Sequence, residues 1–175
     1  MELFEAIQQR HSYRGEFLPT PIPREDLEKI LAAGAAAPSG CNKELTEFIV
    51  VDAPDKRAAI IAMFPDKIFI KTAPAFIVIA SDPTPVYKDK SFELADSAAA
   101  TQNLLLAIAA LGYASVWFDG YLREGADLQL AKLLGIPSPK VARILLPIGR
   151  PANAVKGPNK KPWQSRTHWN QWSNA

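Results

Sequence analysis

Apolar residues recur at the spacing of a helix in five stretches of the chain. The second stretch begins at Pro21-Ile22-Pro23 with acidic residues in its first turn, places Leu27, Ile30 and Leu31 on one face, and ends at Pro38. The pattern therefore predicts helices over residues 2–9, from Pro21 to Pro38, and over 55–63, 92–111 and 126–134.

Four shorter apolar runs, each bounded by turn residues, predict strands over residues 48–51, 75–80, 114–118 and 141–148. The run over 75–80 is apolar on both faces, which indicates a strand in the middle of a sheet. Gly112, between the longest helix and the third strand, is expected to cap that helix.

The order of these elements predicts one mixed α+β domain over residues 1–175, with a sheet sandwiched by helices. The helix over 92–111 has almost no charge after Asp96, which is typical of a helix buried in a core or between subunits. We therefore expect a dimer built around this helix, with an irregular, basic, tryptophan-rich tail over about 157–175 that packs on the partner.

Composition excludes several classes of protein. The 175 residues carry a net charge of +2, which gives no reason to expect nucleic acid or a membrane surface as a partner. Cys41 is the only cysteine, so no internal disulfide forms and a reducing cytoplasm is the simplest setting. The N-terminus is acidic where a signal peptide is basic, and the apolar runs are too short to span a bilayer.

The motifs of several enzyme classes are absent from the sequence. His11 and His168 are the two histidines, and neither has a partner at the spacing of metal ligands. There is no nucleophile elbow, P-loop or dinucleotide fingerprint, and a Ser–His–Asp or Cys–His site has no local signature. We expect no bound metal and no catalytic side chain.

The polar cluster Arg10-His11-Ser12-Tyr13-Arg14 follows the first helix. Two guanidinium groups, an imidazole and a hydroxyl within five residues suit a phosphate dianion. Two plainer interpretations stay open here: a solvated basic turn, and a histidine that interacts with the C-terminus of the helix.

A second polar segment, Pro38-Ser39-Gly40-Cys41-Asn42, follows the second helix. Its small residues let a flat ring approach the backbone closely, although an ordinary helix-ending turn has the same composition. We expect Cys41 to be a buried, inert thiol rather than a contact of the ring. Together the two segments predict a phosphorylated cofactor.

The order of these segments resembles that of the nitroreductase family of FMN-dependent proteins. An Arg-x-Ser segment after the first helix precedes a Pro-Ser-x-x-Asn turn, a Phe-Ile-Val-Val strand and a Thr-Ala-Pro. The helix from Asp96 to Leu106 leads to Leu111-Gly112-Tyr113 and a Trp/Phe strand, and the last strand ends in Gly-Arg-Pro. The resemblance covers nearly the whole chain.

The resemblance implies a nitroreductase-like fold with a mostly antiparallel sheet, and a homodimer with FMN at the interface. Hydride from NAD(P)H would pass through flavin N5, by a ping-pong scheme, to nitroaromatic, quinone or similar acceptors. The FMN phosphate and ribityl chain would be held by Arg10, His11, Ser12 and Arg14, with Lys160 or Lys161 returning from the tail. The ring would be contacted by Pro38, Ser39 and Asn42 of the partner subunit, by Asp119 and Gly120, and by Lys67 at its polar edge.

The sequence departs from the family pattern after Asn42. Where the family usually continues Asn-x-Gln-Pro-Trp, Glu44 and Thr46 replace the glutamine and the tryptophan, so different packing is expected beneath this turn. Two alternative functions also remain at this point. One is a flavin-binding protein of the same fold with a specialised or non-NAD(P)H reaction, and the other is a non-flavin interaction domain that binds a phosphoryl partner.

Overall fold

A computed structural model describes residues 1–155 and 157–172 of the chain, and its centre is a four-stranded sheet. The strands are β1 (Thr46–Val51), β2 (Ala75–Ser81), β3 (Ala114–Ser115) and β4 (Val141–Gly149), in the order β1-β2-β4-β3, and every pair is antiparallel. All seven residues of β2 are buried, which confirms the predicted central strand.

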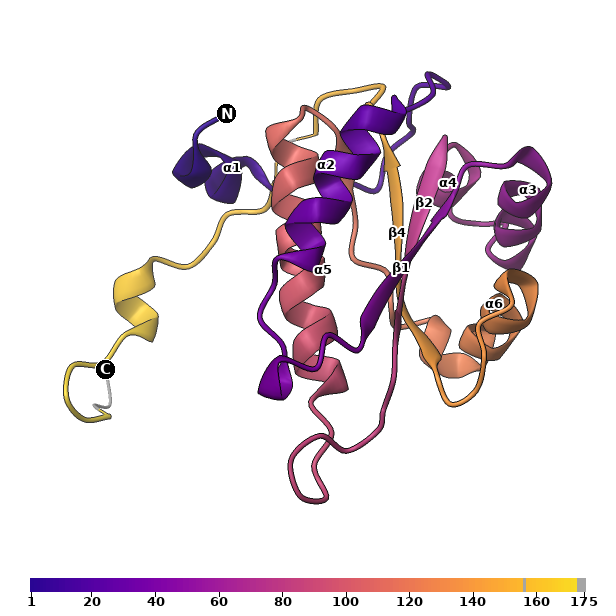
Figure 1. The fold of residues 1–175 in the computed structure, drawn as a ribbon. Coiled ribbons are helices and arrows are strands. Elements are labelled where there is room, and N and C mark those ends of the chain that lie inside the picture. Colours follow the sequence, from indigo (N-terminus) through magenta and orange to yellow (C-terminus); the bar gives the residue numbers. More distant parts are fainter. Residues whose placement is uncertain (156, 173–175) are drawn as a thin grey trace.

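Helices cover both faces of the sheet (Figure 1). On one side lie α2 (Arg24–Ala35) and α5 (Glu93–Ala110), and on the other lie α3 (Pro54–Met63), α4 (Ile68–Lys71) and α6 (Ala126–Leu134). The predicted α+β sandwich is therefore confirmed. Alternate residues of β2 face the two layers, so Ile77 packs with the α5 side and Val78 with the α3 side.

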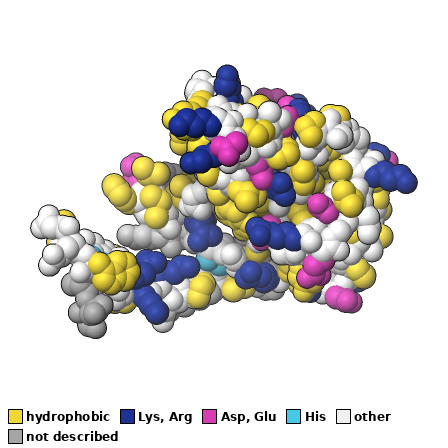
Figure 2. Space-filling model, turned by 90° about the horizontal axis from the view of Figure 1, so that it is seen from below, with side chains coloured by type: hydrophobic (Ala, Val, Ile, Leu, Met, Phe, Trp, Pro, Cys, Tyr) yellow, Lys and Arg dark blue, Asp and Glu magenta, His cyan; other side chains and the backbone are white. Residues whose placement is uncertain are grey.

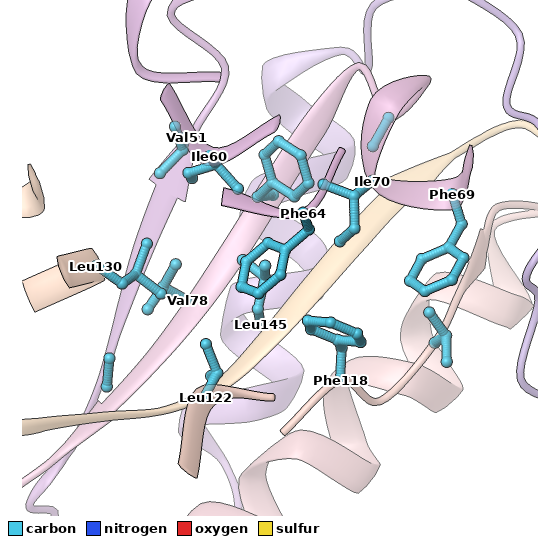
Figure 3. Packing of buried hydrophobic residues seen from close by; sticks show 14 of the residues in the cluster. Val51, Ile60, Phe64, Phe69, Ile70, Val78, Phe118, Leu122, Leu130 and Leu145 are labelled. Atoms are coloured by element: carbon cyan, nitrogen blue, oxygen red, sulfur yellow. The ribbon is translucent and has the colours of Figure 1, made fainter. Parts of the chain in front are cut away.

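The core on the α3 side is rich in phenylalanine (Figure 3). Phe118 meets the rings of Phe64 and Phe69 edge to face, with centroids 5.1 and 5.7 Å apart. This packing fixes the segment that follows β3 against the sheet, because three large side chains lose their contacts if it moves.

The α5 helix spans 18 residues, about 27 Å, and lies close against α2. Gly34 permits this approach, since a Cβ there would lie 2.7 Å from Cδ2 of Leu104. The Asn103 side chain also donates to the Ala33 carbonyl at 3.0 Å. Gly112, with φ of +79°, follows the helix in the left-handed conformation expected of a capping glycine.

The predicted strand over 114–118 is wrong in length. Only Ala114 and Ser115 pair with β4 as a strand, and Phe118 rejoins it through a single bridge to Leu145. The apolar composition of 116–118 reflects burial between layers rather than regular pairing. The sequence also failed to predict α4 and the short 3-10 turns at Gly40–Asn42, Leu122–Glu124 and Trp163–Arg166.

The two ends of the chain lie outside this sandwich (Figure 1). The first helix, α1 (Leu3–Gln9), leaves Leu3, Phe4 and Ile7 largely exposed. The tail stands out from the body with Lys and Arg side chains along it (Figure 2), and Trp163, Trp169 and Trp172 are 58%, 77% and 80% exposed. Such large apolar surface is unusual for a monomer.

Candidate functional site

The polar cluster after α1 is attached to the edge of the sheet. Ser12 forms a parallel bridge with Ser115 of β3, and the backbone N–H of Tyr13 donates to the Ser115 carbonyl at 2.9 Å. This pairing places Arg10 and His11 beside the last turns of α5, and Arg14 is exposed.

A cavity of about 280 Å³ opens between this cluster and the C-terminal half of α5. Its walls include Arg10, His11, Tyr13 and Ser115, together with Leu105 and other apolar residues of α5. Two buried polar atoms in this wall, His11 Nε2 and Ser115 Oγ, have no hydrogen-bond partner among the described residues. Unpaired buried polar groups of this kind suit a polar ligand.

The hydrogen bond of Nδ1, the other ring nitrogen of His11, determines whether Nε2 donates or accepts. Nδ1 lies 2.9 Å from the carbonyl of Gln9, the last residue of α1, and a carbonyl only accepts, so Nδ1 carries the proton. Nε2 is then an acceptor in the neutral ring and a donor in the imidazolium. The interpretation of His11 as a partner of the helix C-terminus is confirmed, and it leaves Nε2 available.

Tyr113 lines the same cavity, and its hydroxyl donates to Asp26 Oδ2 at 2.7 Å. Burial raises the pKa of Tyr113, and the hydrogen bond and charge of Asp26 raise it further. The guanidinium of Arg150 lies 4.8 Å from the centre of the Tyr113 ring and opposes the shift in pKa. Tyr113 is therefore a neutral hydroxyl in this wall at neutral pH.

The edge segment then leads to Asp119 and Gly120. Asp119 is four positions after Ser115, which corresponds to about 13 Å if the chain is extended. A second cavity of about 410 Å³ lies at this end, between the first turns of α5 and the segment over 117–123. The Asp119 carboxylate lines it and pairs with Arg123 at 2.8 Å.

Lys67 lies beside the same segment. Its Nζ donates to the Tyr121 hydroxyl at 3.0 Å and lies 4.5 Å from the centre of that ring, which stacks on Phe118. The structure thus places Lys67 against Tyr121, the residue that follows Gly120.

The turn at Pro38 lies elsewhere, at the N-terminal end of α5. The Gly40 N–H donates to Asp96 Oδ1 at 2.9 Å, and the Glu44 N–H donates to Ser39 Oγ at 3.0 Å. Cys41, Asn42 and Glu44 have φ of 52°, 52° and 53°, a conformation that non-glycine residues rarely adopt and that is strained.

Two side chains of this turn are exposed to solvent. Asn42 is exposed, and so is Cys41, so the prediction of a buried thiol is wrong. The left-handed conformation at Cys41 is the reason, because it turns the side chain away from the packed helices.

A third cavity, of about 490 Å³, lies beneath the turn. Its walls include Pro38 and Ser39, together with Glu44 and Thr46, the two positions that depart from the family pattern. The buried Thr46 Oγ1 has no hydrogen-bond partner among the described residues. The expected difference in packing beneath the turn, relative to the family, stays a prediction.

Lys160 and Lys161 are exposed in the tail. The tail leaves the body beside the polar cluster, since a Cβ on Gly157 would lie 2.8 Å from the Cβ of His11. Their predicted return to the phosphate stays a prediction.

The prediction missed three charged residues: Arg143 and Asp96, which lie in these walls, and Glu93, which pairs with Arg143. Arg143 lines the second cavity, and Asp96 lines the third and holds the turn. A signal was available, because each is an isolated charge within or at the start of an otherwise apolar strand or helix. Such a charge needs a partner when it is buried.

Comparison with known proteins agrees with this geometry. The model of the nitroreductase family matches residues 7–68 and 61–150. The chain belongs to the nitroreductase family. The prediction of an oxidoreductase enzyme of this family is therefore confirmed.

Individual relatives give the same result. The chain is 35% identical to an inferred NADH dehydrogenase/NAD(P)H nitroreductase of Archaeoglobus fulgidus over 86% of either chain. It is 27% identical to the NADPH-flavin oxidoreductase of Vibrio harveyi, over 96% of this chain and 73% of the relative. A crystal structure of an inferred NADH dehydrogenase/NAD(P)H nitroreductase of Parabacteroides distasonis, 29% identical, superposes with a TM-score of 0.84 over 97% and 98% of the two chains.

Within residues 1–155 and 157–172, no three His, Cys, Asp or Glu side chains lie together as metal ligands. In the same part of the chain, no helix is long and apolar enough to cross a membrane.

Proposed function

We propose that this nitroreductase-family enzyme holds FMN along the β3 edge of the sheet and uses NAD(P)H to reduce nitroaromatic, quinone or similar acceptors. The observation that carries the proposal is the pair of unpartnered buried atoms, His11 Nε2 and Ser115 Oγ, on residues that line one cavity together with Arg10. Polar groups left unpaired in a wall of this charge suit a phosphorylated, hydroxyl-bearing ligand.

The phosphate end of FMN belongs with Arg10, Ser12 and Arg14. Guanidinium groups bind phosphate through paired, charge-assisted hydrogen bonds, and a serine hydroxyl adds a directional donor. His11 Nε2 suits a ribityl hydroxyl when the ring is neutral, because it then accepts a hydrogen bond from the hydroxyl. Lys160 or Lys161 from the tail would add positive charge at this end.

The ring end belongs with Asp119, Gly120 and Lys67, about 13 Å along the same edge. The turn of Pro38, Ser39 and Asn42 would complete this end from a second copy of the chain, so the active form is a homodimer. Support comes from the exposed apolar residues of α1 and of the tail, which a second copy would cover.

Bound FMN supplies the hydride chemistry, which requires no acid or base from the protein. The chain would bind and orient the ligand, and Lys67 would place positive charge near the ring, which would favour its reduced, anionic form. Apolar walls at Leu105 and Trp117 exclude water. Overall, NAD(P)H and a proton reduce a quinone to the hydroquinone, and NAD(P)⁺ leaves.

The visible absorbance spectrum of purified protein, reconstituted with FMN and then mixed with NADPH or NADH without oxygen, tests this proposal. We expect bound-flavin absorbance that bleaches when the nicotinamide is added and returns with a quinone. Bound flavin that does not bleach would instead favour a specialised or non-NAD(P)H reaction. Failure to bind FMN would leave the phosphoryl-binding domain as the alternative.

A further inference from the structure

Arg143 occupies a β-bulge in β4. Ile144 pairs with Ile79 and Ala142 pairs with Ala80, so Arg143 is the extra residue that has no partner on β2. Bulges of this kind turn a side chain out of the regular alternation and are frequent beside active sites. Arg143 is directed in this way to the wall of the 410 Å³ cavity that also contains Asp119.

A buried carboxylate fixes the guanidinium in place. Arg143 Nε donates to Glu93 Oε2 at 2.9 Å and Nη2 donates to Oε1 at 2.8 Å, while the Ser81 hydroxyl donates to Oε2 at 2.9 Å. The Glu93 side chain is 9% exposed and that of Arg143 is 29% exposed. Stability alone explains such a pair poorly, since apolar residues of the same shape usually serve as well.

The Arg143–Glu93 pair has no net charge, and the guanidinium still has N–H groups that can donate to a ligand. Glu93 neutralises the guanidinium, and Nη1 has no hydrogen-bond partner among the described residues. The other charges in the cavity wall are Arg123, which pairs with Asp119, and the carboxylate of Asp127. A full anion would therefore meet more negative than positive charge, whereas a neutral oxygen meets a well-placed N–H donor.

The remaining walls suit a flat ring. Trp117, Leu122 and Ile144 supply apolar surface, and the volume is within the range of cavities that bind small molecules. We propose that Arg143 determines acceptor specificity by donating a hydrogen bond to a carbonyl or nitro oxygen of an uncharged aromatic or quinone acceptor in this cavity. The inference rests on the proposed function for the identity of the ligand as the electron acceptor.

Binding of two ligands of matched size tests the inference: neutral 4-nitrobenzamide and anionic 4-nitrobenzoate, titrated calorimetrically into the oxidised, FMN-loaded protein. We expect the wild type to prefer the amide. The double variant Glu93→Gln/Arg143→Met removes the donor without leaving a buried charge, and should weaken amide binding about tenfold or more. Arg24→Met/Glu28→Gln, which removes an exposed Arg–Glu pair on α2, is the matched control.

The single variant Glu93→Gln should change the preference between the two ligands by a different route. It leaves the guanidinium unneutralised, so the preference should shift toward 4-nitrobenzoate by about tenfold. Melting temperatures and circular dichroism establish that both variants fold. Unchanged amide affinity in the double variant, or an unchanged amide-to-benzoate ratio in Glu93→Gln, would overturn the inference.

These titrations need no turnover, so they are independent of the nicotinamide reaction. A wild type that binds the amide through Arg143 but is not bleached by NADPH or NADH would contradict the proposed function and leave the binding site standing. Flavin that is bleached by the nicotinamide, together with ligand binding that does not depend on Arg143, would support the proposed function and contradict the role of Arg143.

Discussion

The polar cluster at Arg10 and the turn at Pro38 are similar in their place along the sequence, but the structure holds and exposes them differently. Each is a short polar segment directly after a helix, and each lies at one end of α5. The cluster is tied to β3 by backbone pairing, and its unpaired atoms lie in a cavity wall. The turn is held by the side chain of Asp96 and leaves Cys41 and Asn42 exposed.

In the proposed dimer, this difference distinguishes the cluster, which lines the site of its own chain, from the turn, which completes the site of the partner. The cluster and the segment at Asp119 share one sheet edge, whereas the turn precedes β1 at the opposite edge. The length of α5, about 27 Å, separates the turn from the cluster. A strained, exposed turn at the sheet edge opposite its expected ligand is consistent with a segment that serves another subunit.

Mixed dimers give the largest expected effect. One chain carries Arg10→Ala and the other carries Gly40→Val, whose Cβ would lie 2.7 Å from the Phe92 ring and displace the turn. If the turn serves the partner, each mixed dimer contains one intact site and one doubly altered site. We therefore expect about half of the wild-type FMN content in purified mixed dimers, although each homodimer binds poorly.

The measurement is the flavin-to-protein absorbance ratio of dimers isolated through two different affinity tags. If both segments served the same chain, mixed dimers would contain no intact site. Flavin content as low as in the homodimers would contradict the assignment of the turn to the partner.

Arg10→Ala tests the phosphate end directly. Loss of a hydrogen bond to a charged group amounts to about 1.5–3 kcal/mol, so FMN affinity should fall roughly 10- to 150-fold. Riboflavin lacks the phosphate, and its affinity should change little. Fluorescence titration of both flavins measures this, with the exposed Arg24→Ala as the control, and equal losses for the two flavins would argue against a phosphate contact.

Asp96→Ala tests the ring end and should give a smaller effect. It removes the acceptor of the Gly40 N–H, a loss of about 1–3 kcal/mol that loosens the turn. FMN and riboflavin affinity should fall by the same factor, because in the proposed site the turn contacts the ring rather than the phosphate. Asp96→Asn keeps an oxygen acceptor and should restore binding.

Thr101→Val is a matched control for Asp96→Ala. Thr101 is buried on the same helix, and its hydroxyl has no hydrogen-bond partner among the described residues. A loss confined to FMN in Asp96→Ala would place the turn at the phosphate end instead.

Tyr113 should give the smallest effect, visible only at high pH. Its raised pKa means that the folded state holds the phenolic proton more tightly than the unfolded state does. The associated stability is complete below the ordinary tyrosine pKa of about 10 and is lost as the pH rises through the folded-state pKa. Urea unfolding at pH 8 to 11 should show this decline, and a Tyr113→Phe variant with the same decline would refute it.

Local pattern was sufficient for most of the fold. The helix predicted over 126–134 is α6, and the apolar run over 75–80 became the buried central strand. These features depend on periodicity and on turn residues, which act within a few positions of the chain. The strand predicted over 114–118 is too long because local pattern does not distinguish an apolar segment that is buried by packing from one that pairs in a sheet.

The sequence alone determined the order of elements and the two polar segments that suggest a phosphorylated ligand. Only the tertiary structure decided which segments share a cavity, that Cys41 is exposed, and that Arg143 and Asp96 lie in cavity walls. The Gly40–Asp96 and Arg143–Glu93 pairs join residues 56 and 50 positions apart. Such contacts depend on strand register, on a bulge and on how closely α5 packs, none of which is encoded in a local pattern.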